Sequence, residues 1–276
     1  MTLMHDRVEK GFYSNRVWDE DAWVKVISVE YEQLTQRYPF GEKFQSLAPK
    51  GKLRLLDVGS GTGIFPSYLD KLLPADLHFV TDFLDVAEAS LQLSEMRFQN
   101  LVHFQAARAI HGRIEDIPKI LPDQRYDVIW AIHSFTTVEI ERMPDVFQRL
   151  IELLAPSGFL FFYQLTSRAA YQDLHDFYRT NHPNGRNAHP FMQYEDSVRI
   201  LDDLGHSLET HEFFFDHSVD ASDPELLEKY LQKCVLDDSL KTVEFFSPLL
   251  SRYLDRSTGV YRFPQSVNFG VLRALN

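Results

Sequence analysis

Residues 53–63 read Leu-Arg-Leu-Leu-Asp-Val-Gly-Ser-Gly-Thr-Gly and carry the strongest structural signal in the chain. The first half is a short apolar run, typical of a buried parallel strand. The three glycines then let the backbone turn and approach a ligand closely, because they have no Cβ atom. Apolar residues at helical spacing follow from Ile64 to Leu73, before Pro74. A strand, a glycine turn and a helix N-terminus predict a site of the nucleotide-binding type.

The glycine spacing separates two kinds of ligand. Dinucleotide sites use Gly-x-Gly-x-x-Gly, in which the third glycine permits close helix packing, but Ile64 stands at that place here. Asp57, two residues before the first glycine, would repel a phosphate and would suit an ammonium group. A dinucleotide-dependent dehydrogenase is therefore disfavoured, and a glycine turn without a ligand stays as a further alternative.

The pattern Asp-x-Gly-x-Gly-x-Gly over residues 57–63 resembles motif I of the class I S-adenosylmethionine (SAM) methyltransferases. SAM has a cationic amino-acid end and no phosphate, which agrees with an acid at Asp57. The resemblance implies that SAM is the cofactor. It also implies that five residues of the motif bind SAM: Asp57, Gly59, Ser60, Gly61 and Gly63.

A second acid follows the next predicted strand, which covers 77–80. Asp82 is expected at the end of that strand, about twenty residues beyond the glycines, where an acid binds ribose hydroxyls in nucleotide folds. The neighbouring Phe83 is expected to cover an adenine face. Asp82 is alternatively a helix N-cap, and the two roles are compatible. Asp85 is expected to be a cap or a first-turn acid.

Strands and helices alternate along the middle of the chain. Further strands are predicted over 106–114, 127–133 and 158–165, and the alternation implies a parallel sheet with helices on its faces. Strands over 208–215 and 261–275 are expected to form an antiparallel pair at the sheet edge. The predicted fold is α/β and Rossmann-like, a mostly parallel seven-stranded sheet flanked by helices. Ligands would bind beyond the carboxyl ends of the strands, where His133 follows the fourth one.

The segment after the third predicted strand is expected to face the adenine. Class I methyltransferases often have an acid there, but Arg113 follows Gly112 in this chain, and a guanidinium cannot accept a hydrogen bond. We expect the backbone of Arg113 and Ile114 to contact the base, with Glu115 or Asp116 as possible acidic substitutes.

Length and composition fit one enzyme-sized domain of 276 residues. We expect an N-terminal helical lid (1–50), a SAM-binding core (51–165) and a C-terminal insertion with the closing strands (166–276). The net charge of −12 argues against binding to nucleic acid or to an anionic membrane. A single cysteine, Cys234, and no recognisable signal peptide or membrane span predict a cytoplasmic protein without disulfides, plausibly a monomer.

The chain from His133 onward resembles the histamine N-methyltransferase-like family. The shared features are four segments in order: 132–138 (Ile-His-Ser-Phe-Thr-Thr-Val), a Ser/Thr-rich turn and aromatic helix over 166–178, a segment over 191–205 that ends Leu-Asp-Asp-Leu-Gly, and a final strand with Gln-Ser-Val-Asn-Phe at 265–269.

This resemblance implies a substrate pocket, carried over position by position. Glu20 matches an acid of the helical lid that holds an imidazole, and His133 stands in place of a glutamine that contacts the substrate amine. Other positions of the family's pocket fall on Thr137, Tyr171, His175, His189 and Gln265. Only Glu20 and Tyr171 keep the family's residue type, which puts histamine itself in doubt.

The predicted function is SAM-dependent methylation of a small molecule, with an amine or imidazole nitrogen as the favoured acceptor. His133 is the candidate to take a proton from the acceptor, with Glu20 beside it, because an imidazole titrates near neutral pH. The alternatives are an O-methyltransferase of a secondary metabolite and a non-catalytic SAM-fold partner subunit. No metal site is expected, because His133, His175 and His189 lie on separate elements without ligand spacing.

Overall fold

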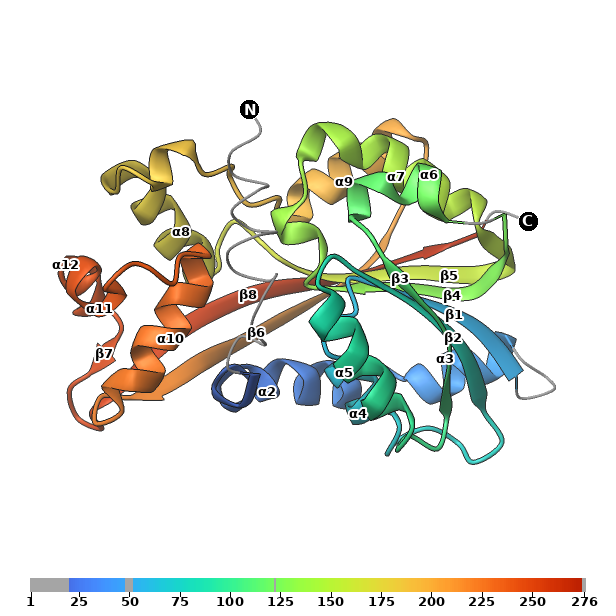
Figure 1. The fold of residues 1–276 in the computed structure, drawn as a ribbon, viewed down its shortest axis with the longest axis horizontal. Helices are drawn as coiled ribbons and strands as arrows, with labels where there is room; N and C mark the ends of the chain where they lie inside the picture. Colours follow the sequence, from blue (N-terminus) through green and yellow to red (C-terminus); the bar gives the residue numbers. More distant parts are fainter. Residues whose placement is uncertain (1–19, 48–51, 122, 275–276) are drawn as a thin grey trace.

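The computed structural model describes residues 20–47, 52–121 and 123–274, with side chains from Trp23 onward. One mixed sheet runs through this part of the chain, in the order β3-β2-β1-β4-β5-β8-β6, with the short β7 paired to β8 (Figure 1). The strands are β1 Lys52–Val58, β2 His78–Asp85, β3 Phe104–His111, β4 Tyr126–Ile132, β5 Leu154–Leu165, β6 Glu209–Asp220, β7 Leu254–Asp255 and β8 Val260–Arg273.

The first five strands are parallel, and β8 and β6 are antiparallel to their neighbours. This confirms the predicted Rossmann-like sheet with an antiparallel pair at its edge; the two-residue β7 adds a strand to the expected seven. Several predicted boundaries are wrong. β5 begins at Leu154 instead of residue 158, and β6 continues through Asp220 instead of ending at residue 215. β2 continues through Asp85 instead of ending near Asp82, and β3 covers Phe104–His111 instead of 106–114.

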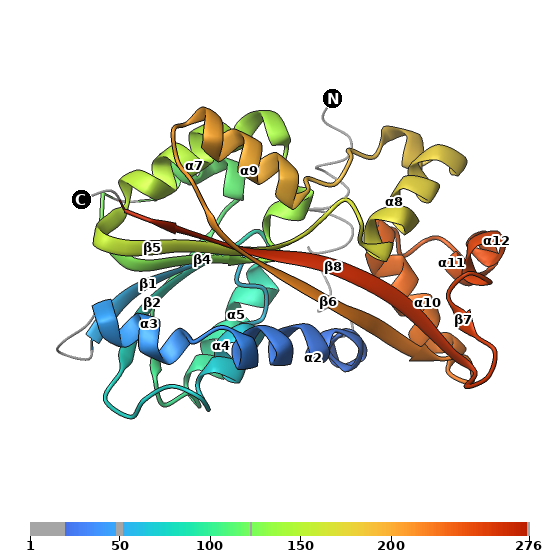
Figure 2. The ribbon, with the colours of Figure 1, turned by 180° about the vertical axis from the view of Figure 1, so that it is seen from behind.

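Helices cover both faces of the sheet (Figures 1 and 2). One face carries α2 Glu20–Arg37, α3 Phe40–Leu47, α4 Ile64–Leu69 and α5 Glu88–Phe98, and the other carries α6 Ile117–Ile120, α7 Met143–Glu152 and α9 Tyr194–Asp203. Each face has its own apolar core, centred on Phe44, Phe161 and Trp130 on the first and on Phe147 and Phe162 on the second. In the described part of the chain, no helix is long and apolar enough to cross a bilayer.

Strands β6 and β8 extend past the parallel strands, and a group of helices packs around their far ends (Figure 2). We call this group the cap: α8 Ala170–Asn181, α10 Pro224–Val235, α11 Thr242–Phe245 and α12 Ser247–Leu250. Helix α2 contacts both α10 and β6. The cap and α2 therefore lie beyond the carboxyl ends of the parallel strands, the edge at which ligands bind in such sheets.

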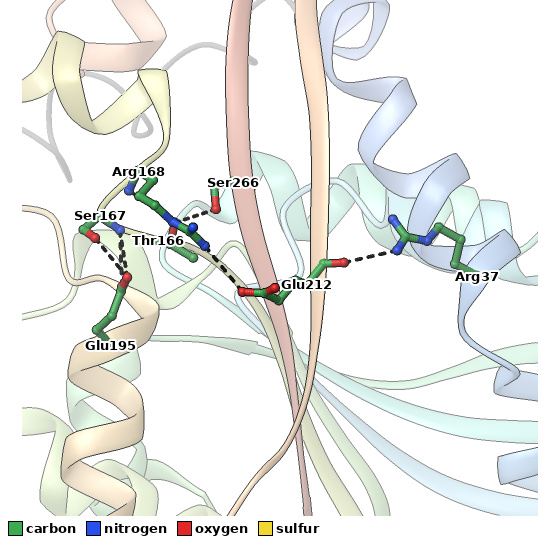
Figure 3. A network of polar contacts seen from close by, with 7 residues as sticks. All are labelled: Arg37, Thr166, Ser167, Arg168, Glu195, Glu212 and Ser266. Carbon is green, nitrogen blue, oxygen red and sulfur yellow. Dashed lines mark hydrogen bonds and ion pairs between the residues drawn. The ribbon is translucent and has the colours of Figure 1, made fainter.

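A polar network fixes the chain where it leaves β5 for the cap (Figure 3). The backbone N–H and hydroxyl of Ser167 donate to Glu195 at the start of α9, and the Thr166 hydroxyl donates to that of Ser266 on β8. Arg168 pairs with Glu212 on β6, whose carbonyl accepts a bond from Arg37 of α2. The turn after β5 is thus bonded to the antiparallel strands β8 and β6 and, through Glu212, to α2.

Candidate active site

Two adjoining cavities lie at the carboxyl ends of the parallel strands. The glycine-loop cavity, of about 230 Å³, is lined by the loops after β1, β2, β3 and β4. The aromatic cavity, of about 150 Å³, is lined by α2, the end of β5, β6, α8 and α10. His133, Thr137 and Lys233 line both cavities. A larger hollow of about 920 Å³ lies at the opposite ends of β2 and β3, and no predicted site residue lines it.

The glycines of the loop have different tasks. Gly59 has φ +68°, and a Cβ atom there would lie 2.5 Å from the Cβ of Ser134. Gly61 has φ +54°, and a Cβ atom would meet nothing within 4 Å, so its open side faces the cavity that it lines. Gly63 packs against Ser94 and Phe98 of α5. Gly63 and Ser60 line neither cavity in this structure, and their contacts with SAM stay predictions.

Asp85, and not Asp82, is the acid of β2 that lines the glycine-loop cavity. Asp82 lies inside β2, 2% exposed, and is bonded to Arg108, Gln124 and Tyr126. Asp85 ends the strand and lines the glycine-loop cavity. Its carboxylate accepts bonds from the backbone N–H groups of Gly61 and Ala87, each at 2.8 Å. Burial raises the pKa of Asp85, and these two amides oppose the shift.

Asp57 lies beneath the loop without lining either cavity. It is 3% exposed near the end of β1, with Trp130 as its neighbour on β4. Burial raises the pKa of Asp57 to about 7; the Trp130 indole opposes the shift and the charge of Asp85 adds to it. The acid of the motif is therefore a buried group at the end of β1, next to Trp130 of β4.

The segment after β3 faces the glycine-loop cavity as expected. Gly112, Arg113, Ile114 and Glu115 line it, and Ile114–Asp116 form a 3₁₀ turn. The prediction for Phe83 is wrong, because this ring is fully buried and stacks on Phe98 at 5.4 Å between centroids.

His133 occupies the boundary between the two cavities. It follows β4 with φ +56°, a conformation that costs energy for a residue with a Cβ atom and is often found at functional sites. Its backbone N–H donates to the Tyr163 carbonyl at 2.8 Å, and its ring packs edge-on against the Tyr163 ring. The Nε2 atom of His133 contacts the carboxylate of Glu30.

Glu30 and His217 were missed by the sequence interpretation. Glu30 is 3% exposed on α2 and contacts His133 through Oε2 and His217 of β6 through Oε1. Burial alone would raise the pKa of Glu30, but the two imidazoles lower it to about 2. A signal was present in both cases. Glu30 lies among Val26, Ile27 and Leu34 on the buried face of its helix. His217 shares the inward face of β6 with Phe213, Phe215 and Val219.

The other predicted substrate residues divide into two groups. Tyr171 lines the aromatic cavity and donates its hydroxyl to the Lys233 carbonyl at 2.8 Å, and Thr137 lines both cavities. Gln265 is 2% exposed and does not line the aromatic cavity; its amide nitrogen donates to the Tyr230 hydroxyl. The side chain of Glu20 lies outside the described residues.

His175 and His189 line neither cavity. The His175 ring is fully buried, stacks on Phe191 and contacts the carbonyl of His189, and burial lowers its pKa to about 4. His189 is exposed. Both predicted contacts are wrong, because the aromatic helix α8 turns Tyr171, and not His175, toward the cavity. Within the described ranges, no three His, Cys, Asp or Glu side chains are grouped to hold a metal ion.

Comparison with known proteins agrees with this geometry. The family model described as a methyltransferase domain matches residues 31–211, and the chain belongs to that family. The chain therefore contains a methyltransferase domain, and its sheet has the class I methyltransferase fold.

The individual relatives and solved structures have low sequence identity to this chain. The malonyl-[acyl-carrier protein] O-methyltransferase 2 of Ilyobacter polytropus is 25% identical over 149 residues, which cover 54% of this chain and 53% of the relative. The chain spans about half the length of the curated relatives it matches. Among solved structures, a putative methyltransferase from Bacillus halodurans superposes with a TM-score of 0.55 at 17% identity, covering 86% of this chain and 99% of the other. Magnesium protoporphyrin IX methyltransferase from Synechocystis PCC 6803, solved with S-adenosylhomocysteine (SAH), gives 0.50 at 12% identity, covering 98% and 94%.

Proposed function

We propose that this enzyme methylates a small molecule at a neutral, protic nitrogen or oxygen, and that His133 takes the proton from the acceptor. The observation that carries the proposal is the position of His133, which lines both cavities and is held by the buried Glu30. The glycine-loop cavity would hold the cofactor and the aromatic cavity the acceptor. The net charge of −12 supports a small-molecule acceptor over a nucleic acid.

The glycine-loop cavity fits SAM by its chemistry. Gly61 leaves room for close approach, Asp85 offers a carboxylate to ribose hydroxyls or to a cation, and the backbone of Arg113 and Ile114 lies where the adenine is expected. When bound, SAM supplies an electrophilic methyl group on a sulfonium. We therefore transfer the ribose role from Asp82 to Asp85.

The proton transfer follows from the His133–Glu30 contact. Because Nε2 of His133 faces the carboxylate, Nδ1 is the ring nitrogen left for the acceptor. As the acceptor lone pair forms the new bond to carbon, the acceptor would lose a proton to Nδ1 and the carbon–sulfur electrons would leave with the sulfur. A hydroxyl would give up the proton of its attacking oxygen, and an imidazole the proton of its other ring nitrogen. The buried carboxylate stabilises the imidazolium that results, in the way that an acid supports a catalytic histidine.

The charges of the aromatic cavity favour a neutral acceptor. Glu30 is already engaged by two imidazoles, and Lys233 brings a cation whose Nζ lies 5.7 Å from the centroid of the Trp23 ring. This cation would repel a protonated amine, but it would not repel a hydroxyl or a neutral imidazole. The resemblance to histamine N-methyltransferase-like enzymes supports an imidazole nitrogen. The malonyl group in the name of the Ilyobacter relative is a carboxylate acceptor, and the test below includes this class.

Radiolabelled methyl transfer tests the proposal. The enzyme is incubated with methyl-labelled SAM and separate pools of phenols, imidazoles, primary amines and carboxylates, and the products are identified. We expect transfer to phenols or imidazoles, lost in His133→Ala. Transfer only to carboxylates, which need no base, or wild-type turnover by His133→Ala would overturn it.

A further inference from the structure

The carboxylate of Glu30 lies between two imidazoles. One oxygen contacts Nε2 of His133 and the other contacts Nε2 of His217, and the Glu30 and His217 side chains are only 4% and 2% exposed. The three residues come from α2, the end of β4 and β6, so they are far apart in sequence. His217 lines the aromatic cavity, but the proton transfer proposed above gives it no task.

The hydrogen-bond partners of His217 assign its proton. The amide nitrogen of Gln265 donates to the Tyr230 hydroxyl at 3.3 Å, so that oxygen is an acceptor there. The Tyr230 hydroxyl lies 3.1 Å from Nδ1 of His217 and can donate its own proton to that nitrogen. The His217 proton then belongs on Nε2, where it points at Glu30.

The same reasoning applies to His133. An ionised carboxylate can only accept, so Nε2 of His133 also carries a proton and Nδ1 has a free lone pair. The unit of one carboxylate and two neutral rings has a charge of −1, which becomes neutral when His133 takes a proton. Two donors would also lower the cost of burying this carboxylate, which is only 4% exposed.

We propose that His217 is a positioning residue, which holds Glu30 ionised and oriented and thereby keeps His133 in the tautomer with a free Nδ1. The inference rests on the proposed function of His133. Without the N–H of His217, the buried carboxylate would direct its full charge at His133. The low pKa of Glu30 agrees with two donors at this carboxylate.

Other charged and titratable groups surround this unit and stay in place in the test. They are Lys233 and Tyr230 on α10, Tyr31 on α2, Tyr163 on β5, Tyr171 on α8 and Asp85 on β2. Substitutions at His217 keep these residues but remove the partner of the Tyr230 hydroxyl. The comparison of His217→Leu with His217→Gln therefore isolates the loss of the donor to Glu30.

Nitrogen NMR of the ¹⁵N-histidine-labelled enzyme saturated with SAH tests the proposal without a known acceptor. His133 is assigned by its loss in His133→Gln. We compare the wild type with His217→Leu, which removes the donor, and His217→Gln, whose amide nitrogen can replace Nε2. In the wild type, both rings should carry the proton on Nε2.

In His217→Leu, the unshared charge of Glu30 should raise the titration midpoint of His133 by at least about half a pH unit, and His217→Gln should restore the wild-type midpoint. Glu30→Gln should lower the midpoint. A His133 ring with its proton on Nδ1, or a midpoint unchanged in a folded His217→Leu, would overturn the inference. Wild-type methyl transfer by His133→Ala would instead refute the proposed function.

Discussion

The two cavities are built in different ways. Apart from Lys233, the glycine-loop cavity takes its walls from residues 59–138, from four loops that each follow a parallel strand. The aromatic cavity takes its walls from residues 23 to 236, on α2, β6, α8 and α10. Parallel strands bring their following loops to one edge by topology alone, whereas the aromatic cavity requires elements distant in sequence to pack correctly.

This difference separates the cofactor from the acceptor. The loops that would hold SAM are fixed by the sheet, and the residues that would choose the acceptor stand on the cap and α2. Only His133, Thr137 and Lys233 belong to both cavities. Substitutions on one side should therefore change one ligand and spare the other, and the boundary residue His133 should be the most sensitive position.

The largest expected effect is on methyl transfer, at that boundary. His133→Ala should lower turnover of the identified acceptor by about 100- to 10,000-fold, the usual contribution of a general base. SAM affinity, measured by calorimetry, should change little, because the ring is one of many groups at the glycine-loop cavity. The matched control is His189→Ala, an exposed histidine outside both cavities, which should turn over like the wild type. A large loss in the control would mean that the segment between α8 and α9 also limits the reaction.

The next largest effect concerns the two acids of β2. Asp85→Asn should weaken SAM binding by about 10- to 100-fold, since it replaces an acceptor of two backbone N–H groups by a side chain with only one acceptor atom. Asp82→Asn should leave SAM affinity within about twofold and lower the melting temperature instead, because it breaks the bonds to Arg108 and Tyr126. Calorimetry and thermal unfolding distinguish the two results. The reverse pattern would restore the original assignment of Asp82.

The glycines allow a smaller and sharper comparison. Gly61→Ala should cost only about 1 kcal/mol of folding stability, from its left-handed backbone, but should weaken SAM binding because the added methyl enters the cavity. Gly59→Ala should cost about 2–3 kcal/mol of stability, since its Cβ would lie 2.5 Å from that of Ser134. The double variant Gly59→Ala with Ser134→Gly should recover part of this loss in urea unfolding. If both single variants behave alike, the two glycines do not have separate tasks.

Much of the glycine-loop cavity could be predicted, because its sequence signals are local. The apolar run, Gly59 and Gly61 and the position of Arg113 all follow from short stretches read along parallel strands. Asp82 was misassigned because a charged residue normally marks the end of a buried strand. Here Arg108, Tyr126 and Gln124 neutralise and satisfy the carboxylate inside the sheet, so the strand continues to Asp85.

The residues of the aromatic cavity could be predicted only in part. Tyr171 and Thr137 were found through a family resemblance and do line the aromatic cavity. The Glu30–His217 pair could not be found, because its members are 187 residues apart and no local pattern links them. The lid acid was predicted at Glu20, whose side chain lies outside the described residues. Glu30, on the buried face of α2, is the acid of this helix that lines the aromatic cavity.

The smallest effect is on stability, and its sign should differ between Asp57 and Glu30. Burial raises the pKa of Asp57 to about 7, so between about pH 4 and 7 the folded protein holds a proton that the unfolded chain releases. The free energy of unfolding should therefore fall as the pH rises through this window, and Asp57→Asn should remove the decline. The pKa of Glu30 is lowered to about 2, so its stabilisation is present above about pH 4.5 and is lost as the pH falls toward 2. Urea unfolding in steps from about pH 3 to 7 measures both slopes. Slopes of the same sign in Asp57→Asn and Glu30→Gln, each relative to the wild type, would show that one of these carboxylates is not held in the charge state that the structure gives it.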